Sequence, residues 1–291
     1  MLLPRLNATV VLVSLSSLSL AYLLERRRRR QNSQKPLPRV AMADGSLEGT
    51  EIILVRHGQT EWNLQGRIQG SGDSPLTEQG IRAAKHLANR LATTGERPTV
   101  IYASPIGRAW NTANLLAEAL QPISVHKEEL MRERSFGCLE GLTSAEQRER
   151  FPESWQRNST RDETYAPPDG ESRLEVRERA MAGLLAIAKR HRQQRILVVT
   201  HSGLLATLMN AVLNQRPNPN PKIRSLALPN TAINLICWSG EGWQLVSWGD
   251  VGEFAPQAPS PTMDVALLVL AAAAAGAAAA IGACSKGRRC G

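Results

Sequence analysis

Two short apolar runs that each lead into a histidine limit the fold of this chain more than any other feature. Residues 52–55 are four consecutive aliphatic side chains, and Arg56 and His57 follow them directly. Residues 196–200 form a similar run that is followed by His201. Uninterrupted runs of this length are typical of strands buried on both faces of a parallel sheet, and ligands bind at the carboxyl ends of such strands. We therefore expect both histidines at one edge of an open sheet.

Expected strands and helices alternate along the chain, which favours a parallel sheet. The expected strands cover residues 51–55, 99–103 and 196–200. One helix is expected to begin at Thr77, and others are expected over residues 105–120, 172–193 and 203–214. Residues 231–238 and 243–248 are expected to form a hairpin. The predicted fold is α/β, a three-layer sandwich with a mainly parallel central sheet and helices on both faces. The polar residues 143–170 are predicted to form a lid that selects the substrate.

A second arginine lies near an expected helix start. We interpret Ser104 as the N-cap and Pro105 as the first helical residue, which puts Arg108 in the first turn. Unpaired N–H groups and the positive end of the helix dipole favour an anion at this place. An imidazole such as that of His57 is a nucleophile toward phosphorus, and guanidinium groups hold phosphate oxygens bidentately. The pattern predicts phosphoryl-transfer chemistry.

Five segments in order resemble the histidine phosphatase superfamily, the clan that includes cofactor-dependent phosphoglycerate mutase. They are RHGQTEWN, SPIGRAWNTA, RERSFG, DGES and VVTHSG, and the resemblance spans roughly residues 50–250. Within the clan the chain looks most like the plant phosphoglycerate-mutase-like phosphatases, some of which are metal-independent phosphoserine phosphatases. The resemblance implies a phosphoglycerate mutase-like fold. It also implies a phosphatase without metal or other cofactor, acting on a small phosphorylated metabolite that is phosphoserine-like or a sugar phosphate.

The resemblance assigns a role to each matching position. His57 matches the nucleophile that becomes a phosphohistidine, and Glu133 matches the acid that protonates the leaving oxygen and later activates water. Arg56, Arg108 and His201 match the groups that surround the transferring phosphoryl group. The further positions implied to contact the substrate or its phosphate are Asn63, Gln69, Gly70 and Ser172. Gln69 stands where the family usually carries a small hydroxyl residue, and Ser172 is also an expected helix N-cap.

Two alternatives to a phosphomonoester hydrolase follow from the sequence. The first is a cofactor-dependent phosphoglycerate mutase, but the stretch between Glu133 and Glu171 is shorter than we expect for the substrate-enclosing insertion of the mutases. The second is an inactive membrane-tethered scaffold. Every catalytic position of the family is filled here, which argues against lost activity.

The net charge of +9 does not indicate a nucleic-acid partner, because of where the charges lie. Residues 1–43 contribute +7 and residues 262–291 contribute +2, so residues 44–261 carry no net charge. A basic nucleic-acid face on this central part is therefore not expected. Cys138, Cys237, Cys284 and Cys290 show neither metal-ligand spacing nor a disulfide framework.

The two ends of the chain are predicted to be extensions of the catalytic domain. The predicted parts are an N-terminal extension at residues 1–43, a histidine phosphatase domain at 44–254, a linker at 255–264, a candidate C-terminal transmembrane helix at 265–283 and a basic tail at 284–291. The apolar residues 8–24 precede a run of five arginines, which fits either a signal anchor or a transit peptide. Translation from Met42 is a third alternative.

From these extensions we expect the catalytic domain to lie in the cytosol. If one of the apolar segments inserts into a membrane, the domain would be anchored there. An arginine-rich flank stays cytosolic when a neighbouring segment inserts. The alternative is a chloroplast or other organelle reached through a transit peptide. The sequence leaves the oligomeric state open.

Overall fold

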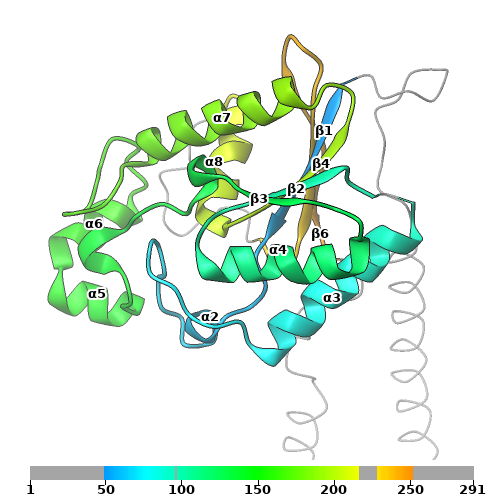
Figure 1. Ribbon diagram of the computed structural model, residues 1–291. Helices are drawn as coiled ribbons and strands as arrows, with labels where there is room; N and C mark the ends of the chain where they lie inside the picture. The colour runs from blue at the N-terminus through cyan, green and yellow to red at the C-terminus, as the bar shows by residue number, and fades with distance from the viewer. Residues whose placement is uncertain (1–48, 96, 216–227, 252–291) are drawn as a thin grey trace, which may run out of the picture. The chain divides into compact units, whose positions relative to one another are not determined.

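The computed structural model describes residues 49–95, 97–215 and 228–251, and these residues contain a six-stranded mixed sheet (Figure 1). Its strands are β1 (Thr50–Arg56), β2 (Val100–Ala103), β3 (Val125–Lys127), β4 (Arg195–Thr200), β5 (Ile233–Trp238) and β6 (Trp243–Asp250), in the order β3-β2-β4-β1-β5-β6. β3, β2, β4 and β1 are parallel, whereas β5 runs antiparallel to β1 and β6 antiparallel to β5. The expected hairpin is thus the antiparallel end of a mainly parallel sheet.

Helices cover both faces of the sheet, as predicted. α7 (Arg173–Arg190) and α8 (Ser202–Val212) pack on one face, and α3 (Glu78–Thr93) and α4 (Gly107–Leu120) pack on the other (Figure 1). Side chains alternate between the faces of a strand, so Ile52 and Leu54 of β1 join the α7 and α8 core while Ile53 and Val55 join the α3 and α4 core. The three-layer α/β prediction is confirmed.

The start of α4 differs from the prediction. The helix begins at Gly107, its N-cap is Ile106, and no side chain caps it. Ser104 does not serve as the N-cap, because its hydroxyl lies 2.8 Å from Nε2 of His201 and accepts a 3.3 Å bond from the Ile106 N–H. Arg108 still lies in the first turn.

The segment predicted as a lid contains two short helices. α5 (Ser144–Arg150) begins with a capping box formed by Thr143 and Glu146, and α6 (Pro152–Ser159) has proline in its first turn. Arg67 donates to both carboxylate oxygens of Glu146, at 2.6 and 3.2 Å, which ties α5 to the chain after α2 (Glu61–Leu64). The short 3₁₀ helices η1 (Glu129–Met131) and η2 (Gly137–Leu139) bracket Glu133.

None of the helices within the described residues is long and apolar enough to cross a membrane. The apolar segments at residues 8–24 and 265–283 lie outside the described residues.

Candidate active site

The two predicted histidines lie side by side because their strands are neighbours in register. In the parallel β1–β4 ladder, Arg56 is opposite Thr200, and the His57 N–H donates to the Thr200 carbonyl at 2.9 Å. The rings of His57 and His201 are 5.2 Å apart between centroids and tilted by 57°. Both residues are almost completely buried. The sequence pattern therefore predicted correctly that two distant segments meet at one edge of the sheet.

The contacts of His57 define its tautomer. Arg108 donates its Nε–H to His57 Nε2 over 3.3 Å, and since a guanidinium cannot accept, Nε2 is the unprotonated nitrogen. The other nitrogen, Nδ1, is 2.7 Å from the carbonyl oxygen of Gly58 and is therefore the donor. Burial, followed by the positive charges of Arg56 and Arg108, lowers the pKa of His57 well below its ordinary value. The ring is a neutral imidazole whose Nε2 lone pair faces a guanidinium.

Arg108 is fixed in place by carbonyl and carboxylate oxygens. Nη1 donates to the Gly72 carbonyl at 2.6 Å and lies 3.3 Å from Asp73 Oδ1, and Nη2 donates to the Gly70 carbonyl at 2.8 Å. Gly70 has a φ of +56°, a left-handed conformation that favours glycine. Burial lowers the pKa of Arg108, while Glu133 and Asp73 act in the opposite direction. The predicted residue Gly70 thus contributes to the site through its backbone.

Arg56 and His201 each leave a buried nitrogen without a hydrogen-bond partner among the described residues. Arg56 donates Nη1 to the Leu228 carbonyl at 2.5 Å, but its Nε has no partner. Burial lowers the pKa of Arg56 to about 10, opposed by Glu133 and reinforced by Arg108. His201 Nε2 contacts Ser104 Oγ, whereas Nδ1 is unpartnered. Buried donors that lack an acceptor are costly, so these nitrogens are suited to a bound anion.

The pKa of His201 is also lowered well below its ordinary value. Burial is the largest cause, followed by the positive charge of Arg108, and the nearby His57 and Arg56 act in the same direction. The ring is therefore neutral at ordinary pH. When the Ser104 hydroxyl donates to Nε2, the proton of His201 lies on Nδ1, the nitrogen without a partner.

Glu133 is held at the start of α8. Its Oε2 accepts from the Gly203 N–H at 3.0 Å, and its Oε1 accepts from the Leu204 N–H at 2.9 Å and from the Arg134 N–H at 3.0 Å. A Cβ placed on Gly203 would lie 2.7 Å from Glu133 Oε1, so this approach requires glycine. Glu133 is only 6% exposed. A helix N-terminus is a favourable place for a carboxylate, and here it fixes the candidate acid.

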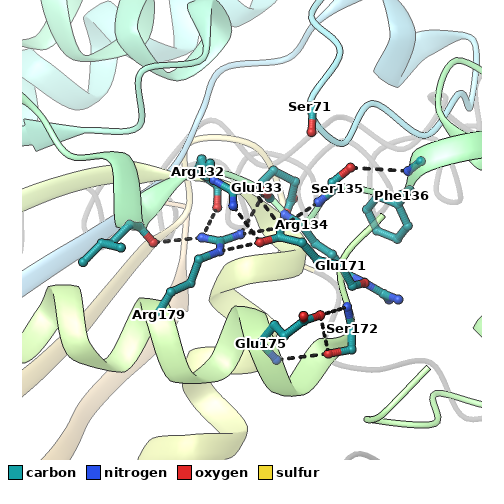
Figure 2. A network of polar contacts seen from close by, with 12 residues as sticks. Ser71, Arg132, Glu133, Arg134, Ser135, Phe136, Glu171, Ser172, Glu175 and Arg179 are labelled. Carbon is teal, nitrogen blue, oxygen red and sulfur yellow. Dashed lines mark hydrogen bonds and ion pairs between the residues drawn. The ribbon is translucent and has the colours of Figure 1, made fainter. Parts of the chain in front are cut away.

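A network centred on Glu171 holds the chain around Glu133 in place (Figure 2). The Glu171 carboxylate accepts from Arg132 at 2.9 and 2.7 Å, from Arg179 at 3.0 Å on each oxygen, and from the Ser135 N–H at 3.0 Å. Arg179 also donates to the carbonyl oxygens of Leu130, Arg132 and Glu133. Burial alone raises the pKa of Glu171, but the bonds from Arg179 and the Ser135 N–H outweigh it, and the net pKa is lowered.

The remaining predicted residues occupy three different environments. Asn63 Oδ1 accepts from the Thr60 N–H at 3.2 Å and from Asn230 Nδ2 at 3.2 Å, close to the His57 carbonyl that Asn230 also binds. Gln69 is buried, and its amide is bonded inside the protein to Thr60 Oγ1 at 2.8 Å and to the Ser74 hydroxyl at 3.1 Å. These bonds do not support the predicted substrate contact of Gln69, which stays a prediction.

Ser172 is the N-cap of α7, as one of its two interpretations predicted. Its hydroxyl accepts from the Glu175 N–H at 3.2 Å, and the Glu175 carboxylate accepts from the Ser172 N–H at 2.7 Å (Figure 2). This capping box satisfies donors at the helix start. A phosphate contact by Ser172 stays a prediction.

Sequence reasoning missed several residues that organise the site. Asn230 and Thr112 support the loop after β1, since Thr112 Oγ1 accepts from the Gly58 N–H at 3.0 Å. Asp73 and Ser104 orient Arg108 and His201. No apolar periodicity or charge pattern marks these positions. Ser104 and Thr112 lie within the recognised segment SPIGRAWNTA, which is the only signal the sequence offers for them. Within residues 49–95, 97–215 and 228–251, no group of three or more His, Cys, Asp or Glu side chains is arranged to hold a metal ion.

Comparison with known proteins agrees with this geometry. Residues 52–251, more than half of the chain, match the histidine phosphatase superfamily (branch 1). The chain belongs to this superfamily, which makes it an enzyme of a group that includes phosphatases and mutases.

Two curated relatives come from Arabidopsis thaliana. The chain is 35% identical to a metal-independent phosphoserine phosphatase over 209 residues, which is 72% of this chain and 84% of the relative. It is 32% identical to phosphoglycerate mutase-like protein 4 over 203 residues, 69% of this chain and 85% of that protein.

Solved structures show the same fold. YhfR from Bacillus stearothermophilus superposes with a TM-score of 0.65 at 33% identity, covering 71% of this chain and 100% of that protein. A phosphoserine phosphatase from Entamoeba histolytica, in complex with 3-phosphoglyceric acid, superposes with a TM-score of 0.62 at 29% identity, again over 71% and 100%.

Proposed function

We propose that this protein is a metal-independent phosphomonoesterase that works through a phosphohistidine at His57. The observation that carries the proposal is the state of that side chain: a buried, neutral imidazole whose Nε2 lone pair lies among the guanidinium groups of Arg56 and Arg108. A neutral imidazole is a nucleophile, and fixed positive charge stabilises the transferring phosphoryl group without metal.

In the first step, Nε2 of His57 attacks phosphorus, the N–P bond forms and the P–O bond to the alcohol breaks. The 3.3 Å contact from Arg108 Nε is released, because the Nε2 lone pair is used in the new bond, and the freed N–H turns to a phosphoryl oxygen. The Nδ1–H bond to Gly58 keeps the ring oriented throughout. Protonated Glu133 gives its proton to the leaving alcohol oxygen.

In the second step, water attacks the phosphohistidine while Glu133 removes a proton from that water. The O–P bond forms, the N–P bond breaks and inorganic phosphate leaves. In this scheme Arg56 Nε and His201 Nδ1 donate to phosphoryl oxygens, which supplies the acceptors they lack among the described residues. The amide nitrogen of Asn63 is a further donor, since its oxygen is already bonded.

The substrate in this proposal is a small phosphorylated metabolite. Relatives and structural neighbours are named as a phosphoserine phosphatase and as a complex with 3-phosphoglyceric acid. Phosphoserine and 3-phosphoglycerate are both phosphomonoesters of small, carboxylate-bearing alcohols. Phosphoserine is therefore the first substrate to test, and p-nitrophenyl phosphate is a general reference.

The test measures hydrolysis and the intermediate together in the full chain with EDTA present. We expect release of inorganic phosphate and an acid-labile, alkali-stable phosphoenzyme. His57→Asn should abolish both, whereas His126→Asn, which changes an exposed histidine of β3, should leave both intact. Turnover that is lost in EDTA and restored by a divalent cation would contradict the proposal. Absence of both turnover and phosphoenzyme would instead favour the scaffold alternative.

The mutase alternative predicts a different fate for the phosphoryl group. With 3-phosphoglycerate we expect inorganic phosphate, with at most a trace of 2-phosphoglycerate. Efficient isomerisation that depends on 2,3-bisphosphoglycerate would make the mutase assignment correct.

A further inference from the structure

Arg173, the first residue of α7, differs from the other arginines near Glu133. Arg132, Arg134 and Arg179 all donate to carboxylate, carbonyl or amide oxygens. The side chain of Arg173 makes no hydrogen bond or ion pair with any described residue, and its Nε is buried without a partner. A buried N–H without an acceptor is unfavourable, so this guanidinium lacks the anion that would complete its environment.

The backbone places Arg173 beside the candidate acid. Arg134 donates its Nε–H to the Glu171 carbonyl at 2.7 Å, and the Ser135 N–H donates to the Glu171 carboxylate at 3.0 Å. The chain that leads into α7 thus runs against the chain that carries Glu133, as Figure 2 shows for Glu171 and Ser172. Arg173 follows these two residues directly.

Charges of both signs act on Arg173, but none of them forms a hydrogen bond or ion pair with its side chain. Burial, followed by the positive charge of Arg161, lowers the pKa of Arg173, and the carboxylates of Glu133 and Glu163 oppose this effect. Arg173 in turn lowers the pKa of Arg134, after burial as the largest cause. Because neither carboxylate is paired with Arg173, its guanidinium is available to an external anion.

Arg173 lies on the leaving-group side of the site. Arg56, Arg108 and His201 surround His57 and, in the proposed mechanism, the phosphoryl group. Glu133, the residue that would protonate the leaving alcohol, acts on Arg173 as it does on Arg56 and Arg108. Only Arg56 and Arg108 among these arginines lower the pKa of His57, so Arg173 lies near the acid and away from the nucleophile. A planar guanidinium fork matches a carboxylate bidentately.

We propose that Arg173 binds a carboxylate carried by the alcohol portion of the substrate, so that the enzyme selects phosphomonoesters of small hydroxy acids. This inference rests on the proposed phosphatase function and adds its substrate class. The carboxylate would fix the alcohol so that its ester oxygen meets Glu133. Binding energy away from phosphorus would then contribute to orientation at the reacting bond.

The test uses two pairs of substrates that differ by one carboxylate: phosphoserine with phosphoethanolamine, and 3-phosphoglycerate with glycerol 3-phosphate. The wild-type enzyme should prefer the carboxylate member of each pair. Arg173→Gln should lower kcat/KM about 10- to 100-fold for the carboxylate members, mostly through KM, and less than about threefold for their partners. Arg173→Lys keeps the positive charge but not the planar fork. Its kcat/KM for the carboxylate members should lie between the values of the wild-type enzyme and of Arg173→Gln.

Two controls keep the outcomes distinct. Lys189→Gln removes one positive charge from an exposed position near the other end of α7, about 24 Å along the helix, and should leave the selectivity unchanged. Turnover of p-nitrophenyl phosphate by Arg173→Gln reports whether the fold and His57 are intact. An equal loss for both members of each pair, or a wild-type enzyme without preference, would overturn the role of Arg173. A wild-type enzyme inactive on every ester would instead overturn the proposed phosphatase function.

Discussion

The two halves of the candidate site are built in different ways. The half that contains His57 and His201 is positioned by backbone pairing, because both residues directly follow neighbouring parallel strands. The half that contains Glu133 lies between two 3₁₀ helices and is positioned by side chains, chiefly Arg179 and Glu171, and by the first N–H groups of α8. The position of the nucleophile therefore depends on strand register, whereas the position of the acid depends on one ionic network.

The largest expected effect separates the chemical roles of the two halves. Glu133→Gln removes the proton donor while keeping the shape of the side chain, so kcat for phosphoserine should fall by roughly 10² to 10⁴. The loss should be much smaller with p-nitrophenyl phosphate, whose leaving group scarcely needs a proton. Steady-state kinetics with both esters checks this, and the exposed Glu129→Gln is the matched control. Equal losses on the two esters would assign the acid role to another residue.

The next prediction breaks the network of the acid half alone. Arg179→Gln removes five hydrogen bonds from a guanidinium that is only 12% exposed and leaves Glu171 with fewer partners. The free energy of unfolding should fall by about 3 kcal/mol, the usual cost of breaking a buried pair. Urea denaturation measures it.

A control on the same helix sharpens this result. Arg177 is two residues earlier on α7, and Arg177→Gln should change the free energy of unfolding by less than about 0.5 kcal/mol, as at most surface sites. If Arg179→Gln changed the free energy of unfolding as little as Arg177→Gln, the ionic network would not be what positions Glu133.

The nucleophile half should respond to pH. Unfolding exposes His57 and His201, which then bind protons near pH 6.5, whereas the folded protein keeps both neutral because their pKa values are lowered. Their contribution to stability is complete above about pH 6.5 and is lost as the pH falls below it. Each histidine contributes a slope of about 1.4 kcal/mol per pH unit.

Urea denaturation between pH 5.5 and 7.5 checks the slope. A variant with both His57→Asn and His201→Asn should lose up to about 2.7 kcal/mol per pH unit of the slope below pH 6.5. His126→Asn, which changes an exposed histidine, should keep the wild-type slope. An unchanged slope in the double variant would mean that both buried imidazoles titrate normally.

The smallest expected effect concerns Ser172. Ser172→Ala removes the N-cap of α7 and should lower the free energy of unfolding by about 1 kcal/mol. KM should change less than about twofold if the hydroxyl serves only the helix. A rise of tenfold or more in KM, measured under conditions in which the variant is fully folded, would support the predicted phosphate contact.

The sequence predicted the nucleophile half well for a physical reason. A strand buried on both faces must be apolar along its length, so the break at Arg56 and His57 marks where the strand reaches the site. The acid half offers no such signal. Glu133 lies in an irregular segment whose position depends on contacts with residues about 40 to 70 positions away, and only the family resemblance identified it.

Other differences have local causes. Ser104 has the residue type of an N-cap, but its hydroxyl is used by His201 across 97 positions, and this tertiary contact outweighs the local preference. Strand β3 was not predicted because three residues at a sheet edge show no pattern. The helices α5 and α6 lack an apolar stripe, yet the T-x-x-E motif at Thr143 and Pro152 at the first helical position are start signals that would have found them.

The order of strands in the sheet has a consequence for how the protein forms during synthesis. Among the described strands β1 is made first, but both of its neighbours, β4 and β5, come from the last part of the described chain. At 5–20 residues per second, roughly 7 to 28 seconds pass between the synthesis of β1 and that of β4. During that interval the nascent chain carries a strand whose apolar residues 52–55 are unpaired, and it has no active site. The nascent chain is therefore inactive and most in need of a chaperone until β5, at residues 233–238, has been added.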